Sequence, residues 1–344
     1  MSSNDSSAAV NFAGGAPKST LDELGETMTN PTPMEYSRAA WSPVLRKAFL
    51  TIFANDFFVL YEACLGLDPQ NPVDALKCAG VTLLGPFKWM AGTLTTASHQ
   101  TDRGAHHPPE FQPLLSFLDD STRLTQVFGY WRDDPNLLPH LVVGDMPLKE
   151  RGKKHPGPGL SFKIIADNLI AALYWHIGKV CSTSSSAELS RVKSTLAEAA
   201  RHNLLSLDAL SDRFPAAIER QKMIVAPTSS GMGIVVPYDR QSEIGYRKLH
   251  LSGKPLRQLL DRIVGSDPGE RSQHQAELDD LINWSNIAND ESDFGAGLQL
   301  GQDLLNHDVA FAKHALQQLR TAYLLLGRRA FATISEEHAK TRLG

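Results

Sequence analysis

Residues 289–295 read Asn-Asp-Glu-Ser-Asp-Phe-Gly and bring together the three carboxylates of Asp290, Glu291 and Asp293. Crowded carboxylates disfavour their simultaneous ionisation, which raises the pKa of at least one of them. Such a carboxylate can act as a general base that accepts the proton of an attacking hydroxyl. A nearby arginine would oppose this shift and hold the carboxylate in place, and Arg247 is the candidate if the fold brings it alongside.

The same acids also have a purely structural interpretation. Acidic residues ahead of a helix cap its free N–H groups and suit its dipole, so Ser292 or Asp293 could be an N-cap. From the residues alone, this interpretation is the commoner one. A calcium-binding loop is excluded, because a loop that starts at Asp290 has Phe294 at its fifth position and Gly301 at its twelfth, where oxygen ligands are needed.

Other candidate sites in the sequence are weaker. His106 and His107 are adjacent and cannot share a helix face, so we expect a surface loop there rather than a metal site. The sequence contains no G-x-x-x-x-G-K-[ST] loop, no strand-linked G-x-G-x-x-G and no G-x-S-x-G elbow. It therefore shows a candidate base without a self-contained active site. A free-standing metal-dependent hydrolase that uses the acidic segment is the least favoured hypothesis.

Composition limits the class of protein. The chain has 344 residues, of which 42% are hydrophobic and 21% charged, as in ordinary globular proteins. Its formal net charge of −4 provides no basic field for wrapping nucleic acid, so we expect no direct DNA binding. Cys64, Cys78 and Cys181 lack C-x-x-C spacing, which argues against a zinc site or a disulfide framework and favours a reducing compartment. No apolar run reaches about 18 residues and no secretory signal is visible, so no membrane span is expected.

The acidic segment is predicted to lie between two helices. Periodic apolar residues run through Leu278, Leu281 and Ile282 into it, and a second helix around residues 298–305 leaves it. A further helical stripe, with alternating spacings of three and four, consists of Val309, Ala312, Leu316, Leu319, Tyr323 and Leu326. This spacing predicts one face turned toward a core.

The remaining elements mix helices and strands. Helices are predicted at residues 36–50, 55–66, 167–180, 187–203 and 255–264, and short β-runs at 81–84, 126–131 and 140–143. Asn55 is expected to cap the helix that it opens, because an apolar run follows it. Residues 233–237 and 245–249 flank a polar turn and are predicted to pair as a β-hairpin.

The predicted fold class is therefore α+β, with a small mixed α/β N-terminal half and a mainly α-helical C-terminal half that contains a β-hairpin. We expect a disordered tail at residues 1–33, which are rich in small and polar residues. An α/β domain is expected at 34–181 and a helical domain carrying the acidic loop at 182–344, with residues 182–186 (STSSS) as the linker. The basic loop 149–159 (KERGKKHPGPG) is interpreted as solvated, with contact to phosphate or a histone tail as the alternative.

Several segments together resemble the histone PARylation factor family. They are residues 55–72 (NDFFVLYEACLGLDPQNP), 81–92 (VTLLGPFKWMAG), 108–112 (PPEFQ), 128–133 (FGYWRD), 231–249, 287–304 (IANDESDFGAGLQLGQDL) and 331–338 (FATISEEH). The similarity spans about residues 45–340 in the order found in the family, and that order makes it specific. The N-terminal tail and residues 149–159 are not covered.

The resemblance implies that this chain is not an enzyme on its own. Members of the family dock on the catalytic domain of a DNA-break-activated poly(ADP-ribose) polymerase and form a joint active site that directs ADP-ribosylation to serine on histones and other proteins. By the resemblance, Glu291 is the catalytic glutamate, Asp290 contacts the polymerase, and Tyr246 and Arg247 dock and order the site. The polymerase holds NAD, so no cofactor and no metal are expected on this chain. A monomer in the nucleus, recruited to chromatin at DNA breaks, is implied as well.

Two positions depart from the family pattern. Ser292 stands where relatives can have Cys, and Phe294 stands where they have Tyr, so the hydrogen bonds of the loop could differ. The resemblance also implies shorter ADP-ribose products, because a docked subunit blocks chain growth. The alternative hypothesis is a non-catalytic binding module that recruits the polymerase to chromatin, with the acidic loop as a docking surface for basic residues.

Overall fold

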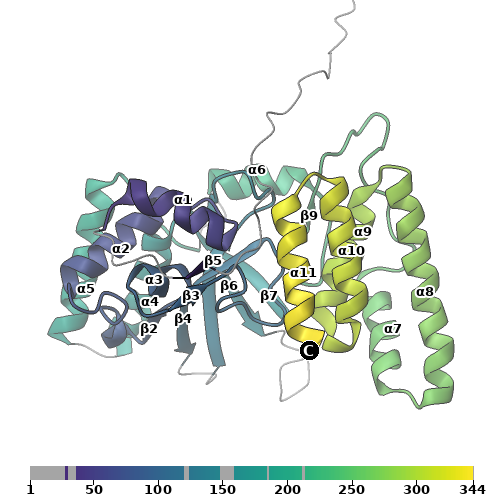
Figure 1. Ribbon diagram of the computed structural model, residues 1–344, viewed down its shortest axis with the longest axis horizontal. Coiled ribbons are helices and arrows are strands. Elements are labelled where there is room, and N and C mark those ends of the chain that lie inside the picture. The colour runs from purple at the N-terminus through teal and green to yellow at the C-terminus, as the bar shows by residue number, and fades with distance from the viewer. Residues whose placement is uncertain are drawn as a thin grey trace, which may run out of the picture.

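A computed structural model of the chain describes residues 28–29, 36–119, 124–147, 159–183, 186–210 and 214–343. The molecule is elongated, with a central sheet, helices α1 to α5 at one end and helices α7 to α11 at the other (Figure 1). The predicted α+β class is confirmed. Of the predicted tail, the described part is Met28–Thr29, a strand β1 that pairs with β3 (Thr96–Ala97). Residues 149–158 of the predicted basic loop lie outside the described residues.

The central sheet is antiparallel, in the order β2-β4-β5-β6-β7. Its strands are β2 (Val81–Leu83), β4 (Phe111–Asp119), β5 (Leu124–Trp131), β6 (Leu141–Pro147) and β7 (Leu160–Ala166). The three predicted β-runs correspond to β2, β5 and β6, whereas β4 and β7 were not predicted. Successive side chains on a strand point to opposite faces. Tyr130 therefore packs into one apolar cluster and Trp131 into another, on the opposite face of the sheet.

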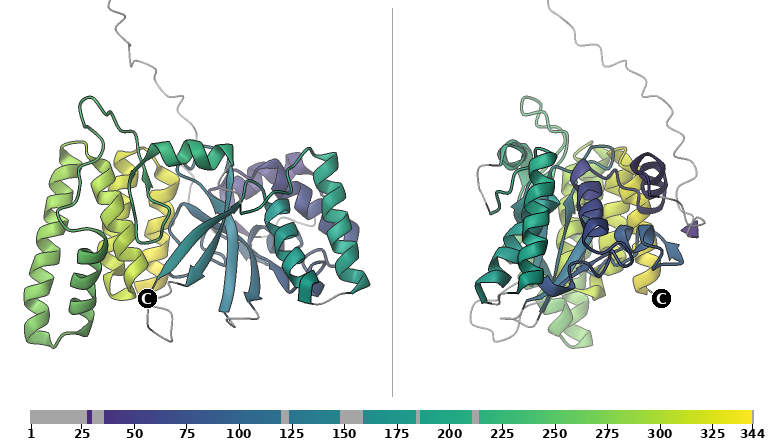
Figure 2. Two further views of the ribbon diagram at one scale, coloured as in Figure 1. Left: turned by 180° about the vertical axis from the view of Figure 1, so that it is seen from behind. Right: turned by 90° about the vertical axis from the view of Figure 1, so that its left-hand side faces the viewer.

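One face of the sheet is covered by the N-terminal helices (Figure 2). They are α1 (Arg38–Phe49), α2 (Asn55–Leu67), α3 (Pro86–Met90), α4 (Leu169–Thr183) and α5 (Ala187–His202), with the short η1 (Lys77–Ala79). Helix α5 lies beyond the predicted boundary at residues 181/182, yet its Leu189 and Leu196 belong to the same core as α2 and α4. The Ser186 side chain caps α5 by accepting from the Leu189 N–H at 3.0 Å.

The predicted cap at Asn55 is wrong in its detail. Helix α2 does begin there, but Ala54 occupies the N-cap position and no side chain caps the helix. The Asn55 Oδ1 instead accepts from the Arg38 guanidinium at 2.6 Å. The buried Asp56 ties the helix to the fold, because it accepts from the Leu169 N–H at 2.7 Å and from the Tyr130 hydroxyl at 2.8 Å.

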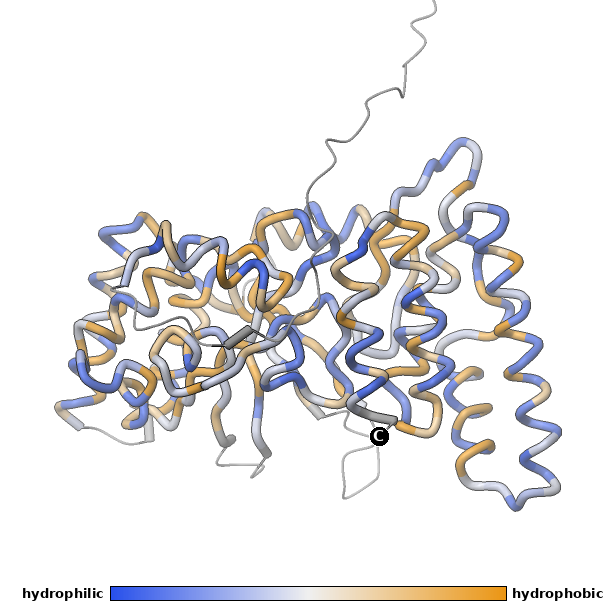
Figure 3. The backbone as a smooth tube through the Cα atoms, viewed as in Figure 1, coloured by the Kyte–Doolittle hydropathy of each residue, from blue (hydrophilic) through white to orange (hydrophobic). Residues whose placement is uncertain are grey.

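The C-terminal half is mainly helical, as predicted. Its elements are α6 (Pro215–Met223), α7 (Gly253–Gly265), α8 (Pro268–Asp290), α9 (Phe294–His307), η2 (Val309–Phe311), α10 (Ala312–Leu325) and α11 (Arg329–Leu343). The central members of the predicted stripe, from Ala312 to Tyr323, are buried in α10, whereas Val309 is 57% exposed in η2. Hydrophilic residues dominate the outer helix α8 (Figure 3). No helix in the described ranges is both long and apolar enough to span a membrane.

The predicted hairpin forms with a different partner strand. Strand β9 (Ile234–Val235) pairs with β8 (Ile224–Ala226), which lies before it in the chain. Residues 245–249 form no strand, and the polar turn contributes a single bridge between Asp239 and Ile244. This error matters for the site, because residues 245–247 are free of a β-ladder and lie along the acidic loop instead.

Candidate functional site

The acidic segment forms the tight connection between α8 and α9. The Ser292 N–H donates to the Asn289 carbonyl at 3.0 Å, and the Asp293 N–H donates to the Ala288 carbonyl at 2.8 Å. These bonds close the last turn of α8, and they place Ser292 in the left-handed region with φ of 71°. Helix α9 then begins directly at Phe294, so the chain reverses with Glu291 at the turn.

Residues 245–247 lie against this turn through two hydrogen bonds of the Gly245 backbone, one to a side chain and one to a backbone group. The Gly245 N–H donates to the Asp293 Oδ1 at 3.0 Å, and the Gly295 N–H donates to the Gly245 carbonyl at 2.9 Å. Gly245 has φ of 115°, and a Cβ there would lie 2.1 Å from the carbonyl oxygen of Pro237. A side chain at position 245 is therefore excluded both by conformation and by space.

This contact brings Arg247 alongside the carboxylates, the condition under which it is a candidate partner for them. The Arg247 Nη2 lies 2.5 Å from the Glu291 Oε2, and the Arg247 Nε lies 3.0 Å from the Asp293 Oδ2. The Glu291 side chain is 52% exposed, whereas that of Asp293 is 7% exposed. One guanidinium thus bridges a solvent-facing carboxylate and a buried one, and it fixes the orientation of the solvent-facing one.

The other two predicted site residues lie beside this bridge. The Tyr246 hydroxyl donates to the Gln299 Oε1 at 3.0 Å, and burial raises the pKa of that phenol. Gln299 in turn donates to the Pro227 carbonyl at 2.9 Å, so Tyr246 is linked to the strand region before β9. Asp290 is exposed at the end of α8, next to Glu291. The structure therefore gathers all four predicted residues on one part of the surface.

Two neighbouring surface hollows lie near this site. The smaller, of about 500 Å³, is lined by Gly245, Ser292 and Phe294 together with apolar residues of α10 and its end. The larger groove, of about 890 Å³, shares Pro237 and Tyr238 with it and runs between α6, β9 and the loop after β5. Its walls include the exposed apolar residues Leu137, Leu138 and Met223. The acidic turn thus borders the smaller hollow, and Pro237 and Tyr238 separate that hollow from the larger groove.

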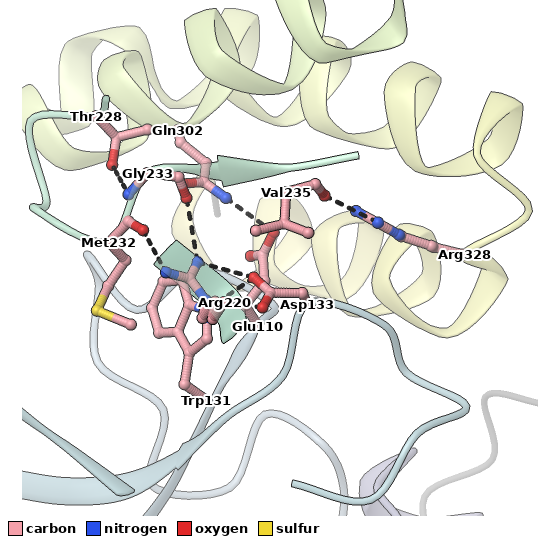
Figure 4. Close-up of polar contacts among 10 residues, drawn as sticks. All are labelled: Glu110, Trp131, Asp133, Arg220, Thr228, Met232, Gly233, Val235, Gln302 and Arg328. Carbon is pink, nitrogen blue, oxygen red and sulfur yellow. Dashed lines mark hydrogen bonds and ion pairs between the residues drawn. The ribbon is translucent and has the colours of Figure 1, made fainter. Parts of the chain in front are cut away.

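Arg220, which lines the larger groove, ties together several segments of the chain (Figure 4). Its guanidinium forms a two-pronged ion pair with Asp133, with distances of 2.7 and 2.8 Å, and donates to the Met232 carbonyl at 2.6 Å. Arg328 donates to the Val235 carbonyl at 2.9 Å from the other side. The Arg220 bonds hold the residues before β9 against the end of β5, and the Arg328 bond holds β9 against the helical half. Together they set the position of the segment that leads to Tyr246.

Behind the groove, a buried polar network joins the two halves of the molecule. Both Gln302 Nε2 and the Tyr323 hydroxyl donate to the Glu110 Oε1, at 2.8 and 2.7 Å. Burial raises the pKa of Glu110, and it lowers the pKa of Arg103 to about 10 and that of Arg132 to about 9. Sequence reasoning missed this network, because a lone Glu in a Pro-rich segment looks like a surface residue; the signal available was the motif at residues 108–112.

The surface loop predicted at the adjacent histidines is wrong for His107. This side chain is buried, with its ring 2.9 Å from the Asp145 carboxylate. The ring of His106 meets the carbonyl of Leu305 in α9 at 3.0 Å, so His106 helps to join the halves, whereas His107 is bound to β6 within the N-terminal half. In the part of the chain that the structure describes, no group of three or more His, Cys, Asp and Glu side chains is arranged to hold a metal ion.

The sequence predicts Asp293 only as one acid of the crowded segment or as a helix cap. It does occupy the N-cap position of α9, but its side chain makes no capping hydrogen bond. Its oxygens face Gly245 and Arg247 instead. Only the tertiary contact between the two segments reveals this role.

Comparison with known proteins identifies relatives along almost the whole chain. The family model described as "Histone PARylation factor 1" matches residues 41–342. A Bos taurus protein named "Histone PARylation factor 1" is 32% identical, and the match covers 96% of this chain and 97% of that protein. The protein of the same name from Mus musculus is 32% identical over 90% of each chain, and the one from Danio rerio is 31% identical over 84% of this chain and 82% of its own.

Proposed function

This chain belongs to the histone PARylation factor family, and on that premise we propose that it completes the active site of a partner poly(ADP-ribose) polymerase for transfer of ADP-ribose to serine. The partner holds the donor substrate NAD, and this chain supplies Glu291 as a general base. The proteins modified are histones and other proteins in the DNA damage response. The chain acts as a monomer in the nucleus and has no transferase activity alone.

The proposed chemistry explains why a carboxylate in trans is useful. A serine hydroxyl is a weak nucleophile near neutral pH because it retains its proton. Glu291 accepts that proton as the serine oxygen bonds to the ribose carbon of NAD and nicotinamide leaves. General-base assistance of this kind is worth roughly 10² to 10⁴ in rate. Glutamate and aspartate acceptors are already ionised, so the added base selects serine.

The observation that carries the proposal is that Glu291 is both open to solvent and oriented. Its side chain is 52% exposed at a helix-to-helix turn, and Arg247 holds one of its oxygens at 2.5 Å. A carboxylate kept only for stability would be expected to cap a helix or to fill a buried network, as Glu110 does. Glu291 is instead held where a second protein can bring a substrate to it.

Docking is assigned to the surface around this carboxylate. Asp290 is exposed beside it, and Arg247 keeps a side chain that is 44% exposed while bridging the two acids. Exposed apolar residues border the same surface, among them Tyr238, Ile244 and Leu325. Apolar residues ringed by charges are suited to a protein partner.

The decisive experiment is Glu291→Gln, which keeps the shape of the side chain and removes its basicity. Serine ADP-ribosylation is measured with polymerase, NAD, broken DNA and histone, and docking is measured by calorimetry. We expect serine labelling to fall by about 10² or more with docking retained. Unchanged serine labelling with intact docking would contradict the proposed function.

The second candidate function is a non-catalytic module that recruits the polymerase. It is favoured by the same exposed apolar border, which a catalytic role alone does not require. In that case Asp290→Ala and Glu291→Ala would both weaken docking to a similar extent. Glu291→Gln would then have no separate effect on serine transfer by the docked complex.

A further inference from the structure

We propose that Asp293 is a positioning residue for the serine transfer, because it anchors Arg247 and through it orients Glu291. The inference rests on the proposed function, in which Glu291 is the base. It concerns a residue whose place at a helix start would otherwise mark it as an ordinary cap. Three observations, on capping, burial and the geometry of the bridge, carry it.

Asp293 does not cap the helix at whose start it stands. An aspartate at an N-cap position normally accepts from the N–H groups of the first turn. Here the Gly295 N–H, in that turn, donates to the Gly245 carbonyl at 2.9 Å, and Asp293 makes no side-chain capping bond. Because the backbone of residue 245 takes over that capping function, both oxygens of Asp293 are available for another role.

Asp293 is buried and each of its oxygens has one defined partner. The Oδ1 accepts from the Gly245 N–H at 3.0 Å, and the Oδ2 lies 3.0 Å from the Arg247 Nε. The Asp293 side chain is 7% exposed, so solvent and salt screen this ion pair much less than they screen an ion pair on the surface. The same carboxylate thus fixes two groups: the backbone of Gly245, just before Tyr246, and the Nε of the Arg247 guanidinium.

The guanidinium transmits this order to Glu291. The N–H groups of a guanidinium lie in one plane at fixed angles to one another. An ion pair at Nε therefore restricts the directions in which the two Nη atoms can point. The Nη2 then meets the Glu291 Oε2 at 2.5 Å. Without Asp293, the Arg247 side chain, which is 44% exposed, would move together with Glu291 and would not restrict the orientation of that carboxylate.

The test is Asp293→Asn, which keeps an oxygen for the Gly245 N–H and removes the charge that faces Arg247. Serine transfer is measured with polymerase, NAD, broken DNA and histone over a range of concentrations of this protein. The rate at saturation is thereby separated from the half-saturating concentration. We expect the saturated rate to fall about 10- to 100-fold, the order expected for a displaced catalytic group.

The matched control is Asp308→Asn, at the start of η2. Asp308 accepts from the Ala310 N–H at 2.8 Å and is therefore a capping aspartate of the ordinary kind. We expect this variant to have the wild-type saturated rate. A merely structural role for Asp293 would make the two variants alike.

A second arm tests whether Asp293 acts through Arg247. The double variant of Asp293→Asn and Arg247→Ala should have the saturated rate of Arg247→Ala alone, since residues that act as one unit are not additive. Losses that multiply would overturn the inference. If Asp293→Asn does not fold, Arg247→Lys tests the same bridge, because one ammonium cannot bind both carboxylates as the guanidinium does. A wild-type saturated rate for Arg247→Lys would likewise overturn it.

Glu291→Gln, assayed alongside, separates this inference from the proposed function. If Glu291→Gln abolishes serine transfer and Asp293→Asn has the wild-type rate at saturation, the positioning role is refuted and the proposed function stands. If Glu291→Gln leaves serine transfer unchanged, the proposed function itself is refuted and the positioning role with it.

Discussion

Glu110 and Glu291 both have polar partners, but Glu110 is buried between the halves of the molecule and Glu291 lies at its surface. Glu110 is 2% exposed between the halves of the molecule, where Tyr323 and Gln302 both donate to one of its oxygens. Glu291 is at the surface, and its partner is the half-exposed Arg247. The first carboxylate is committed to neighbours within the chain, and burial raises its pKa. The second retains access to solvent and to any protein that docks there.

The difference teaches that position in the fold, not residue type, separates a carboxylate that joins parts of the chain from one that a second protein can reach. A buried carboxylate without its partners is costly, so its removal should act on stability. An exposed carboxylate contributes little to stability, so its removal should act on function. Four predictions would break or sharpen this contrast.

The largest expected effect on stability is that of Glu110→Ala. It leaves the Tyr323 hydroxyl and the Gln302 amide without their buried acceptor, at about 1–3 kcal/mol for each group. We therefore expect a loss of about 3 kcal/mol or more in the free energy of unfolding, measured by urea denaturation. Glu291→Ala, the matched surface variant, should change it by no more than about 0.5 kcal/mol. If both variants lose the same free energy of unfolding, the contrast between the buried and the exposed glutamate is wrong.

The next effect is the pH dependence of Asp303, a buried acid on the helix that leaves the acidic turn. Burial raises its pKa to about 6, although its carboxylate accepts from the Ser229 N–H at 2.7 Å. A raised pKa means that the folded state binds the proton more tightly, so stability is lost as pH rises from about 4 to about 6. Asp303→Asn does not titrate and should gain up to about 3 kcal/mol relative to wild type across that window. A constant difference between the variants from pH 4 to pH 7 would show that burial does not set this titration.

A smaller effect is expected on docking. Arg247→Ala removes the cation that bridges Glu291 and Asp293, and with it a planar group able to bind a carboxylate of a partner. We expect about a tenfold weaker affinity for the polymerase by calorimetry. Arg262→Ala is the control, since Arg262 is similarly exposed but lies on α7 with Glu277 as its partner. If the Arg247 variant binds the polymerase with unaltered affinity, the proposal that docking uses this surface is wrong.

The smallest effect concerns the turn itself. Ser292 adopts φ of 71°, where residues with a Cβ are strained by roughly 1–2 kcal/mol. Ser292→Gly should therefore stabilise the protein by up to about 1 kcal/mol in thermal or chemical unfolding. Ser190→Gly, inside α5, should change stability in the opposite direction by a similar amount. A destabilised Ser292→Gly protein would mean that the serine side chain contributes more than its conformation costs.

Local patterns predicted the elements around the site well. The helices on both sides of the acidic segment and the buried stripe in α10 follow from a 3.6-residue period, which depends only on neighbours in the sequence. The strands β4 and β7 were missed. Pro113 in β4 reads as a strand breaker, and the structure accommodates it where the pairing register shifts.

The errors near the site all concern partners that lie far apart in the chain. Residues 245–249 look like a strand, yet their partner is the turn at residues 291–295 and not β9. His107 is predicted to lie in a surface loop, yet its side chain is buried against Asp145. A hydrophobic period of two residues in a strand, or of 3.6 residues in a helix, indicates on which face a side chain lies. It does not indicate which distant segment of the chain covers that face.

By itself, the sequence determined the α+β class and the helices that present the acidic turn. These follow from local periodicity, from capping and turn chemistry, and from the order of unusual motifs along the chain. Tertiary structure alone decided which acids are buried, that Asp293 faces Arg247 rather than the helix, and that Glu291 stays at the surface. The physical reason is that burial and ion pairing depend on which distant segments meet, and no local pattern encodes that meeting.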